Sequence, residues 1–220
     1  WVIDTDARVY KYDRKLNTID NLPELPHNDR MNHKWQYVMG IDLGWNDATA
    51  FVVLAYHPLD GNRKLYVVDT YKASDMTGDD VADKIRFFQK KYSGVRLIID
   101  PASKQFIEDL RARYGFHFIS AQKSDKKGHI GMLNSDLLLG KIKLNIKADN
   151  TVHELEDELI GLIWDVKARE RGKYKEHDAC ENHLCDSFLY AWRYTYAYVN
   201  DPSNEVLDAH ATSRDPAVVQ

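Results

Sequence analysis

The sequence predicts an α/β fold in which helices flank a mixed β-sheet, made of an antiparallel three-stranded meander plus parallel strands. Two patterns support this prediction. Three short runs rich in β-branched and aromatic residues follow one another directly, and helical and extended patterns then alternate along the chain. The chain has 220 residues, 44% apolar and 29% charged, so it can bury one large core or two small ones.

The meander comes first. A turn signal, the run 58–62 (PLDGN), separates the second and third strands, and the three strands are expected at 35–43, 50–56 and 65–71. A helix should follow, because Thr77 is a favourable N-cap residue and apolar residues then recur at helical spacing as far as residue 91.

The later elements alternate. We expect, in order, a buried strand at 95–100, a helix at 105–114, a strand at 116–119, a helix at 130–139, an extended piece at 141–144, a helix with an acidic face at 152–163, a hairpin at 165–176 and a helix at 179–198. The crossover helix makes the strand at 95–100 parallel to an earlier one. If that neighbour is the first strand, both strands end at the same edge of the sheet.

Three parts of the chain are expected: a connecting segment at 1–34, a domain at 35–200 and a flexible tail at 201–220. Prolines 23 and 26 favour extended chain in the first part, and the last twenty residues are polar and aperiodic. The chain does not begin with Met, so we expect a fragment of a longer protein. Apolar runs are too short for a membrane span, and two Cys cannot form a disulfide framework. The net charge of −4 excludes a histone-like binder but not a local nucleic-acid-binding patch.

Two carboxylates lie in apolar strand patterns. Asp42 stands between Ile41 and Leu43, and Asp100 ends the run 97–99. Burying a carboxylate is costly unless it is paired or binds metal. One such residue is usually structural, whereas two at one sheet edge repel each other, and a divalent cation relieves that repulsion. Both the structural and the metal-ligating interpretation remain open from this pattern.

A third carboxylate comes from the last predicted helix. Asp178, Asn182 and Asp186 recur every four residues and would form one row, apart from an apolar stripe of Leu184, Cys185, Phe188 and Trp192. Packing through that stripe would aim Asp186 at the sheet edge. The alternative is that Asp178 caps the helix and Asp186 is solvated.

Several motifs together resemble a known family. They are GIDLGWNDATA at 40–50, IIDPA at 98–102, LCDSFLYA at 184–191 and the weaker LLLGKI at 137–142. In this order they are similar to the nuclease domain of the large terminase subunit of tailed bacteriophages, which has a ribonuclease-H-like fold. The resemblance spans about residues 8–197.

The resemblance implies an endonuclease that cuts double-stranded concatemeric viral DNA during genome packaging. Matched acids Asp42, Asp100 and Asp186 would hold two divalent cations, Mg²⁺ or Mn²⁺, which activate water and stabilise the leaving 3′ oxygen. Many members carry another acid directly before the third one, where this chain has Cys185; Asp47 and Asp178 are the candidate helpers. The resemblance also implies partners: an ATPase motor domain, a small terminase subunit and a portal or procapsid. It implies that the protein acts in the cytoplasm of the infected host and without a membrane.

Other residues have weaker signals. His183 lies near Asp186 and is either a solvated residue or a contact to phosphate or bound water. Two basic clusters are either solvated faces or phosphate contacts: Lys123, Lys126, Lys127 and His129, and then Lys167, Arg169, Arg171, Lys173 and Lys175. Aromatic residues form no interleaved stacking platform, which predicts little sequence specificity.

Three rival functions are compatible with parts of the sequence. A sugar-kinase or actin type phosphotransferase opens with a similar strand and turn but needs a second, duplicated domain, for which 220 residues leave no room. The G-x-x-x-x-G-K-[ST] phosphate-binding loop of an ATPase motor is also absent from the sequence, so we expect the chain to be the nuclease half of a terminase and not to bind ATP. A junction-resolving nuclease of the same fold is the nearer rival. A non-catalytic module that docks on DNA or capsid is the third.

Overall fold

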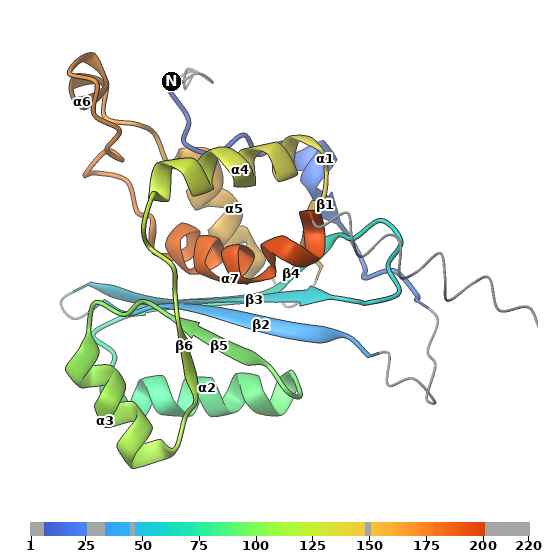
Figure 1. The fold of residues 1–220 in the computed structure, drawn as a ribbon, viewed down its shortest axis with the longest axis vertical. Helices are drawn as coiled ribbons and strands as arrows, with labels where there is room; N and C mark the ends of the chain where they lie inside the picture. Colours follow the sequence, from blue (N-terminus) through green and yellow to red (C-terminus); the bar gives the residue numbers. More distant parts are fainter. Residues whose placement is uncertain (1–6, 26–33, 45–46, 148–150, 201–220) are drawn as a thin grey trace, which may run out of the picture.

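The computed structural model describes residues 7–25, 34–44, 47–147 and 151–200, and shows one sheet between two layers of helices (Figure 1). Seven strands form the sheet: β1 (Thr18–Ile19), β2 (Gln36–Asp42), β3 (Ala48–Tyr56), β4 (Leu65–Ser74), β5 (Arg96–Ile99), β6 (Phe118–Ser120) and β7 (Ile142–Asn145). The predicted tail at 201–220 lies outside the described residues.

The strand order is β1-β7-β4-β3-β2-β5-β6. Strands β2, β3 and β4 pair antiparallel, which confirms the meander. Strand β5 pairs parallel with β2, as expected from the crossover helix, with Ile99 opposite Ile41. The other pairs, β5–β6, β4–β7 and β7–β1, are also parallel, so the predicted mixed α/β fold is confirmed.

Helices cover both faces of the sheet. One face carries α4 (Lys126–Leu138), α5 (Val152–Gly161) and α7 (His183–Asn200), and the other carries α2 (Gly78–Lys91) and α3 (Lys104–Tyr114) (Figure 1). Two short helices, α1 (Arg14–Asn17) and α6 (Val166–Glu170), lie outside these layers. Thr77 caps α2 as predicted, in a reciprocal arrangement with Asp80. Within the described residues, no helix is long and apolar enough to cross a bilayer.

Helix α7 begins at His183, four residues later than predicted. A residue on another helix determines where α7 starts. Glu158 Oε2 on α5 accepts hydrogen bonds from the backbone N–H groups of Leu184 and Cys185. A carboxylate here satisfies two of the free N–H groups at a helix start and favours its dipole. The expected row of Asp178, Asn182 and Asp186 on one helix face is therefore wrong, because the first two precede the helix.

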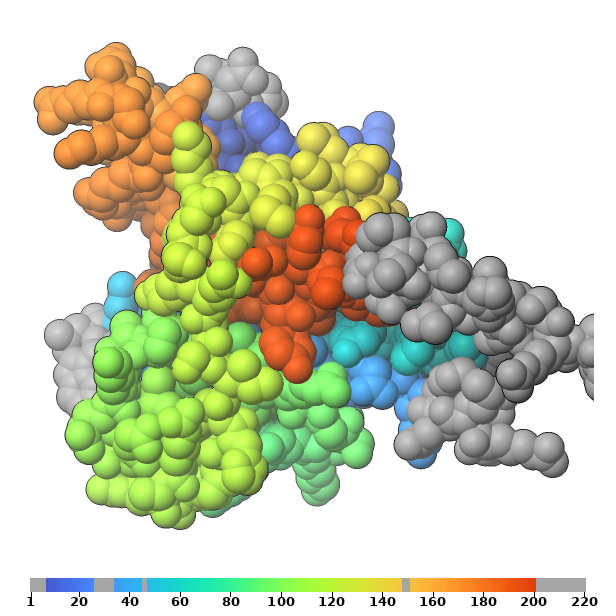
Figure 2. Space-filling view, in the orientation of Figure 1, coloured from blue at the N-terminus to red at the C-terminus, as the bar shows by residue number. Residues whose placement is uncertain are grey.

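The predicted hairpin at 165–176 is also wrong in its first half. Asp165 caps the short helix α6 by accepting a hydrogen bond from Ala168 N–H, and the chain turns at Gly172, whose φ is 72°. Only the stretch after Gly172, which pairs with Trp164 through Glu176, is extended. We call residues 165–177 the α6 segment; it projects from the body of the domain (orange in Figure 2).

Three short stretches far apart in the sequence form a small backbone ladder. The middle stretch, residues 162–164, pairs with residues 7–9 on one side through the antiparallel bridge Arg8–Ile163. On its other side it pairs with residues 175–177 through the antiparallel bridge Trp164–Glu176. The hydrogen bonds are Trp164 N to Ala7 O, 2.9 Å, and His177 N to Ile163 O, 2.9 Å. This ladder joins the base of the α6 segment to the start of the described chain.

Part of the predicted connecting segment is built into the domain. Tyr10 is fully buried in the core beneath α4 and α7, and β1 extends the sheet beside β7. Buried Asn17 donates hydrogen bonds to the carbonyl groups of Leu137 and Ile142, which fixes α1 against the same layer. Residues 7–19 therefore contribute to the fold.

Candidate active site at the carboxyl edge of the sheet

Asp42 and Asp100 lie side by side where β2 and β5 end. The backbone N–H of Asp100 donates to the Ile41 carbonyl group at 3.1 Å, which continues the parallel pairing by one residue. Asp100 Oδ1 accepts a hydrogen bond from Ala102 N–H, and the residue is only 8% exposed. The sequence expectation that both carboxylates share one sheet edge is confirmed.

Asp186 reaches this edge because α7 packs unusually close to the sheet. Gly40 on β2 leaves room for the helix backbone: a Cβ atom there would lie 1.8 Å from the Ser187 carbonyl oxygen. The Ser187 hydroxyl group donates to the Ala50 carbonyl group on β3 at 2.9 Å. Ala50 is the residue opposite Asp42 in the β2–β3 pair. These contacts hold the first turn of α7, with Asp186, beside Asp42.

The hydroxyl group of Tyr190 contacts one of the three carboxylates and is affected by the charges of all three. Burial raises the pKa of Tyr190 most, and the charges of Asp186, Asp42 and Asp100 raise it further. Tyr190 also donates a hydrogen bond of 3.4 Å to Asp100 Oδ2. One hydroxyl group thus lies within electrostatic reach of acids from β2, from the end of β5 and from α7.

Two lysines predicted to contact DNA pair with these acids in the structure. Lys123 Nζ lies 2.6 Å from Asp100 Oδ2. Lys126 Nζ lies 2.6 Å from Asp186 Oδ1 and 2.8 Å from Glu176 Oε2. Both lysines come from the stretch that rises from β6 to α4 past this end of the sheet (Figure 1). Sequence reasoning missed Glu176, which ends a predominantly basic segment.

His183 links two acids. Its Nδ1 atom lies 3.2 Å from Asp42 Oδ2, and its Nε2 atom lies 3.1 Å from Asp47 Oδ1. The hydrogen bond with Asp42 raises the pKa of His183, burial opposes the rise, and the charge of Asp47 adds to it. Asp178, by contrast, is exposed and bonds Lys175 Nζ at 2.7 Å.

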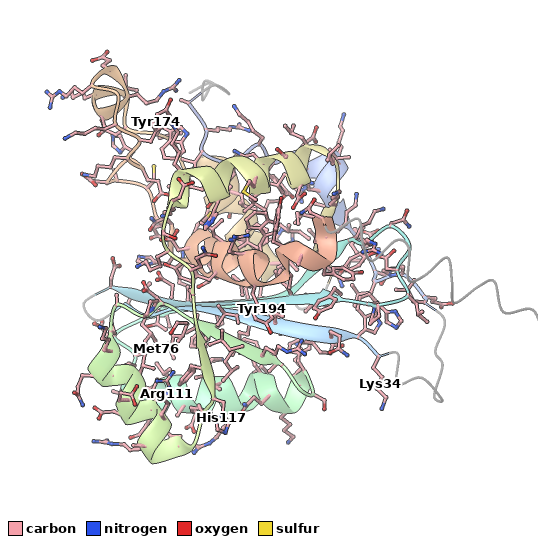
Figure 3. All side chains as sticks on the ribbon, in the orientation of Figure 1. Lys34, Met76, Arg111, His117, Tyr174 and Tyr194 are labelled. Carbon is pink, nitrogen blue, oxygen red and sulfur yellow. The ribbon has the colours of Figure 1, made fainter. Side chains whose placement is uncertain are left out.

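The remaining basic candidates lie on or beside the α6 segment. Lys127 Nζ stands 3.2 Å from the centre of the Tyr174 ring, a cation–π contact. Tyr174 is seen on the projecting segment, away from the sheet (Figure 3). The segment also exposes Lys167, Arg169, Arg171, Lys173 and Lys175. His129, grouped with the first cluster by sequence, is buried on α4.

Oxygen donors of this kind fit a hard divalent cation. As the side chains stand, no three His, Cys, Asp or Glu residues of the described chain are gathered closely enough to hold one ion. The ammonium group of Lys126 lies between Asp186 and Glu176, and the ammonium group of Lys123 lies against Asp100. We call the Lys126 ammonium group the stand-in cation, because it balances two carboxylates at once.

Burial raises the pKa of Asp186 to about 6 from its ordinary 3.8; Lys126 opposes the rise, and the charges of Glu176 and Asp42 add to it. The folded chain therefore binds this proton more tightly than the unfolded chain. The resulting stabilisation is full below about pH 3.8 and is lost as the pH rises through about 6.

We accordingly expect the unfolding free energy of metal-free protein to lose ~3 kcal/mol from this group between pH 4 and pH 7. The Asp186→Asn variant should show a flatter pH dependence over that range. Urea unfolding in the presence of a chelator measures both curves. Parallel curves for wild type and variant would contradict the assignment.

Comparisons with known proteins agree with this picture. No protein-family model matches the chain. The large terminase subunit of Escherichia phage T5 is 28% identical over 181 residues, which cover 80% of this chain and 40% of that protein. The chain thus spans less than half the length of this curated relative.

Two solved structures have the same fold. The large terminase of the thermophilic bacteriophage D6E gives a TM-score of 0.68 at 22% identity, over 84% of this chain and 44% of that one. The nuclease domain of the large terminase of bacteriophage SPP1, solved with bound Mn, gives 0.57 at 20% identity, over 76% of this chain and 91% of that one.

The fold and site define a ribonuclease-H-like domain with acidic residues gathered at the carboxyl edge of its sheet. Within that class, the chain is similar in sequence to the large terminase subunit of Escherichia phage T5, and its fold matches that of the nuclease domain of the SPP1 large terminase. The resemblance noted in the sequence motifs is confirmed.

Proposed function

We propose that this chain is a metal-dependent endonuclease domain that cuts double-stranded viral concatemer DNA during genome packaging. The observation that supports this most is that Asp42 and Asp100 end neighbouring parallel strands and that the close packing of α7 on β2 brings Asp186 to the same edge of the sheet. Three acids from two strand ends and one helix are more than a structural role in the core requires.

In this proposal the three carboxylates hold two divalent cations, Mg²⁺ or Mn²⁺. When bound, such cations activate water and stabilise the leaving oxygen of a phosphodiester. Asp42 lies between the other two acids in the sheet-and-helix arrangement and is the residue best placed to contact both ions. His183 orients Asp42 through its 3.2 Å contact, and its Nε2 atom would contact phosphate if Asp47 moved away from it.

In this proposal the basic residues contact DNA phosphates, which implies an enzyme with little sequence specificity. Once a divalent cation replaces them, Lys123 and Lys126 are free to pair with DNA phosphates beside the carboxylates. Lys127 and the exposed cations of the α6 segment extend this positive surface: Arg169, Arg171, Lys173 and Lys175. Such contacts position a duplex and do not read its bases.

The wider assembly is part of the same proposal. The match to less than half of a large terminase subunit supports an adjoining ATPase motor domain, with the small subunit and the portal or procapsid as further partners. The site of action would be the cytoplasm of the infected host. The assisting roles of Asp47 and Asp178 in metal binding also stay proposals.

Incubation of supercoiled plasmid with the chain tests the proposal directly. We expect nicking and linearisation with Mn²⁺ or Mg²⁺ and none after chelation. Ca²⁺ should bind without supporting cleavage, because its looser and wider coordination does not enforce the required arrangement. Cleavage in a chelator, or in Ca²⁺ alone, would contradict the mechanism, and no cleavage with any ion would favour the docking module.

Two further assays separate this proposal from the rival functions. A junction-resolving nuclease would cut four-way junctions in preference to a linear duplex of the same sequence. A phosphotransferase would bind ATP with micromolar affinity in calorimetry, whereas the chain lacks the phosphate-binding loop.

A further inference from the structure

We propose that Glu176 is a fourth carboxylate ligand of the metal site, which binds the divalent cation together with Asp186. This inference rests on the proposed function, because it adds a ligand to the same site. Its starting point is the position of Lys126, whose ammonium group lies between two carboxylates that are ten residues apart in the sequence and come from different elements.

The two contacts of Lys126 define where a cation sits. Its Nζ atom is 2.8 Å from Glu176 Oε2 and 2.6 Å from Asp186 Oδ1. Two carboxylates that enclose one ammonium ion at these distances provide oxygen donors that a divalent cation also uses. A doubly charged ion gains more than a singly charged one from two neighbouring negative charges, and it therefore competes for this position.

One oxygen of the Glu176 carboxylate is left without a hydrogen bond in the described structure. Its Oε2 atom also accepts a hydrogen bond of 2.7 Å from Asn182 Nδ2, which orients the group. Its Oε1 atom is buried and accepts no hydrogen bond from any described residue. An oriented carboxylate with one unsatisfied buried oxygen is costly to maintain unless a ligand uses it.

The backbone ladder holds Glu176 at the site. Trp164 bridges Glu176 directly, and the His177 N–H group bonds the Ile163 carbonyl group, so Glu176 is anchored on both sides. A cleft of about 390 Å³ opens next to it, lined in part by Glu176, Asn182, His183 and Asp47. Solvent and small ions thus have access to Glu176 from the side of the site that His183 and Asp47 also face.

Mn²⁺ binding to the whole chain, measured by calorimetry without DNA, tests the inference apart from activity. We expect Glu176→Gln to weaken Mn²⁺ binding at one site by about tenfold or more, as even second-sphere changes at metal sites do. Glu170→Gln, which removes the same charge from an exposed position of the α6 segment, should leave Mn²⁺ affinity unchanged. Thermal unfolding without metal checks that both variants fold.

A double variant separates direct ligation from an effect through Lys126. Lys126→Met removes the stand-in cation and should strengthen Mn²⁺ binding. If Glu176 is a ligand, Glu176→Gln weakens binding in the Lys126→Met background as well. If its effect disappears there, Glu176 acts only by pairing Lys126, and the inference is wrong.

The outcome also distinguishes this inference from the proposed function. Wild-type Mn²⁺ binding that is lost in Asp186→Asn but unchanged in Glu176→Gln overturns the role of Glu176 and leaves the nuclease proposal intact. A wild-type chain that binds no Mn²⁺ overturns both.

Discussion

Each of the variants Asp42→Asn, Asp100→Asn and Asp186→Asn is expected to lower the rate of plasmid cleavage with Mn²⁺ by about a thousandfold or more. Asparagine keeps the shape of the side chain but removes the charge that holds a divalent cation. A thousandfold loss corresponds to about 4 kcal/mol in the activation free energy, within the range that metal ions contribute to phosphodiester hydrolysis. Initial rates of nicking measure the effect.

The matched control is Asp83→Asn, because Asp83 is exposed on α2 and pairs only with its neighbour Arg86 among the contacts seen. It should cleave at the wild-type rate. Nicking at the wild-type rate by any one of the three site variants would remove that residue from the site. Far-UV circular dichroism and thermal unfolding of each variant establish that lost activity is not lost structure.

Gly40→Ala is expected to destabilise the domain by at least about 3 kcal/mol, or to prevent folding altogether. The added methyl group would meet backbone atoms of Ser187 on α7, at 1.8 Å from the carbonyl oxygen and 2.8 Å from the carbonyl carbon. Backbone in the middle of a packed helix cannot turn aside as a side chain can, so α7 must move off the sheet. Urea unfolding measures the loss.

Gly61→Ala serves as the comparison, because a Cβ atom at that exposed turn position meets nothing within 4 Å. Its unfolding free energy should stay within about 0.5 kcal/mol of wild type. A similarly small change for Gly40→Ala would show that α7 does not rest directly on β2. Partial retention of folding with loss of Mn²⁺ binding would instead support the role of this contact in placing Asp186.

The sheet and two of its acids could be predicted from the sequence because their signals are local. Runs of β-branched residues mark β2, β3 and β4, and a crossover helix requires parallel pairing of the next strand. Asp42 and Asp100 interrupt or end apolar strands, which makes them visible without tertiary information. The two facts together place both carboxylates at one edge.

The start of α7 and the form of the α6 segment could not be predicted in the same way. The sequence around 179–182 does not exclude a helix; Glu158, more than twenty residues away, decides where the helix begins. Asp165 has the N-cap role that favours a helical turn, but the alternating charges after it also match a strand. Both outcomes depend on competition between local preference and long-range contacts.

Lys123 and Lys126 show a second limit of prediction from sequence. A basic cluster in a sequence suggests phosphate, yet Lys123 and Lys126 face carboxylates in the folded chain. Charge patterns do not reveal which acids will be nearby after folding. Glu176 was missed for the same reason, since only the ladder with residues 162–164 brings it to Asp186.

That ladder also connects the first described residues to Glu176. A force applied at Ala7 passes through backbone hydrogen bonds to Trp164, and Trp164 is the bridge partner of Glu176. Two rows of backbone hydrogen bonds thus link residues 7–9 to Glu176, whose carboxylate lies beside Asp186. A displacement of residues 7–9 would therefore be passed to Glu176 through backbone hydrogen bonds alone.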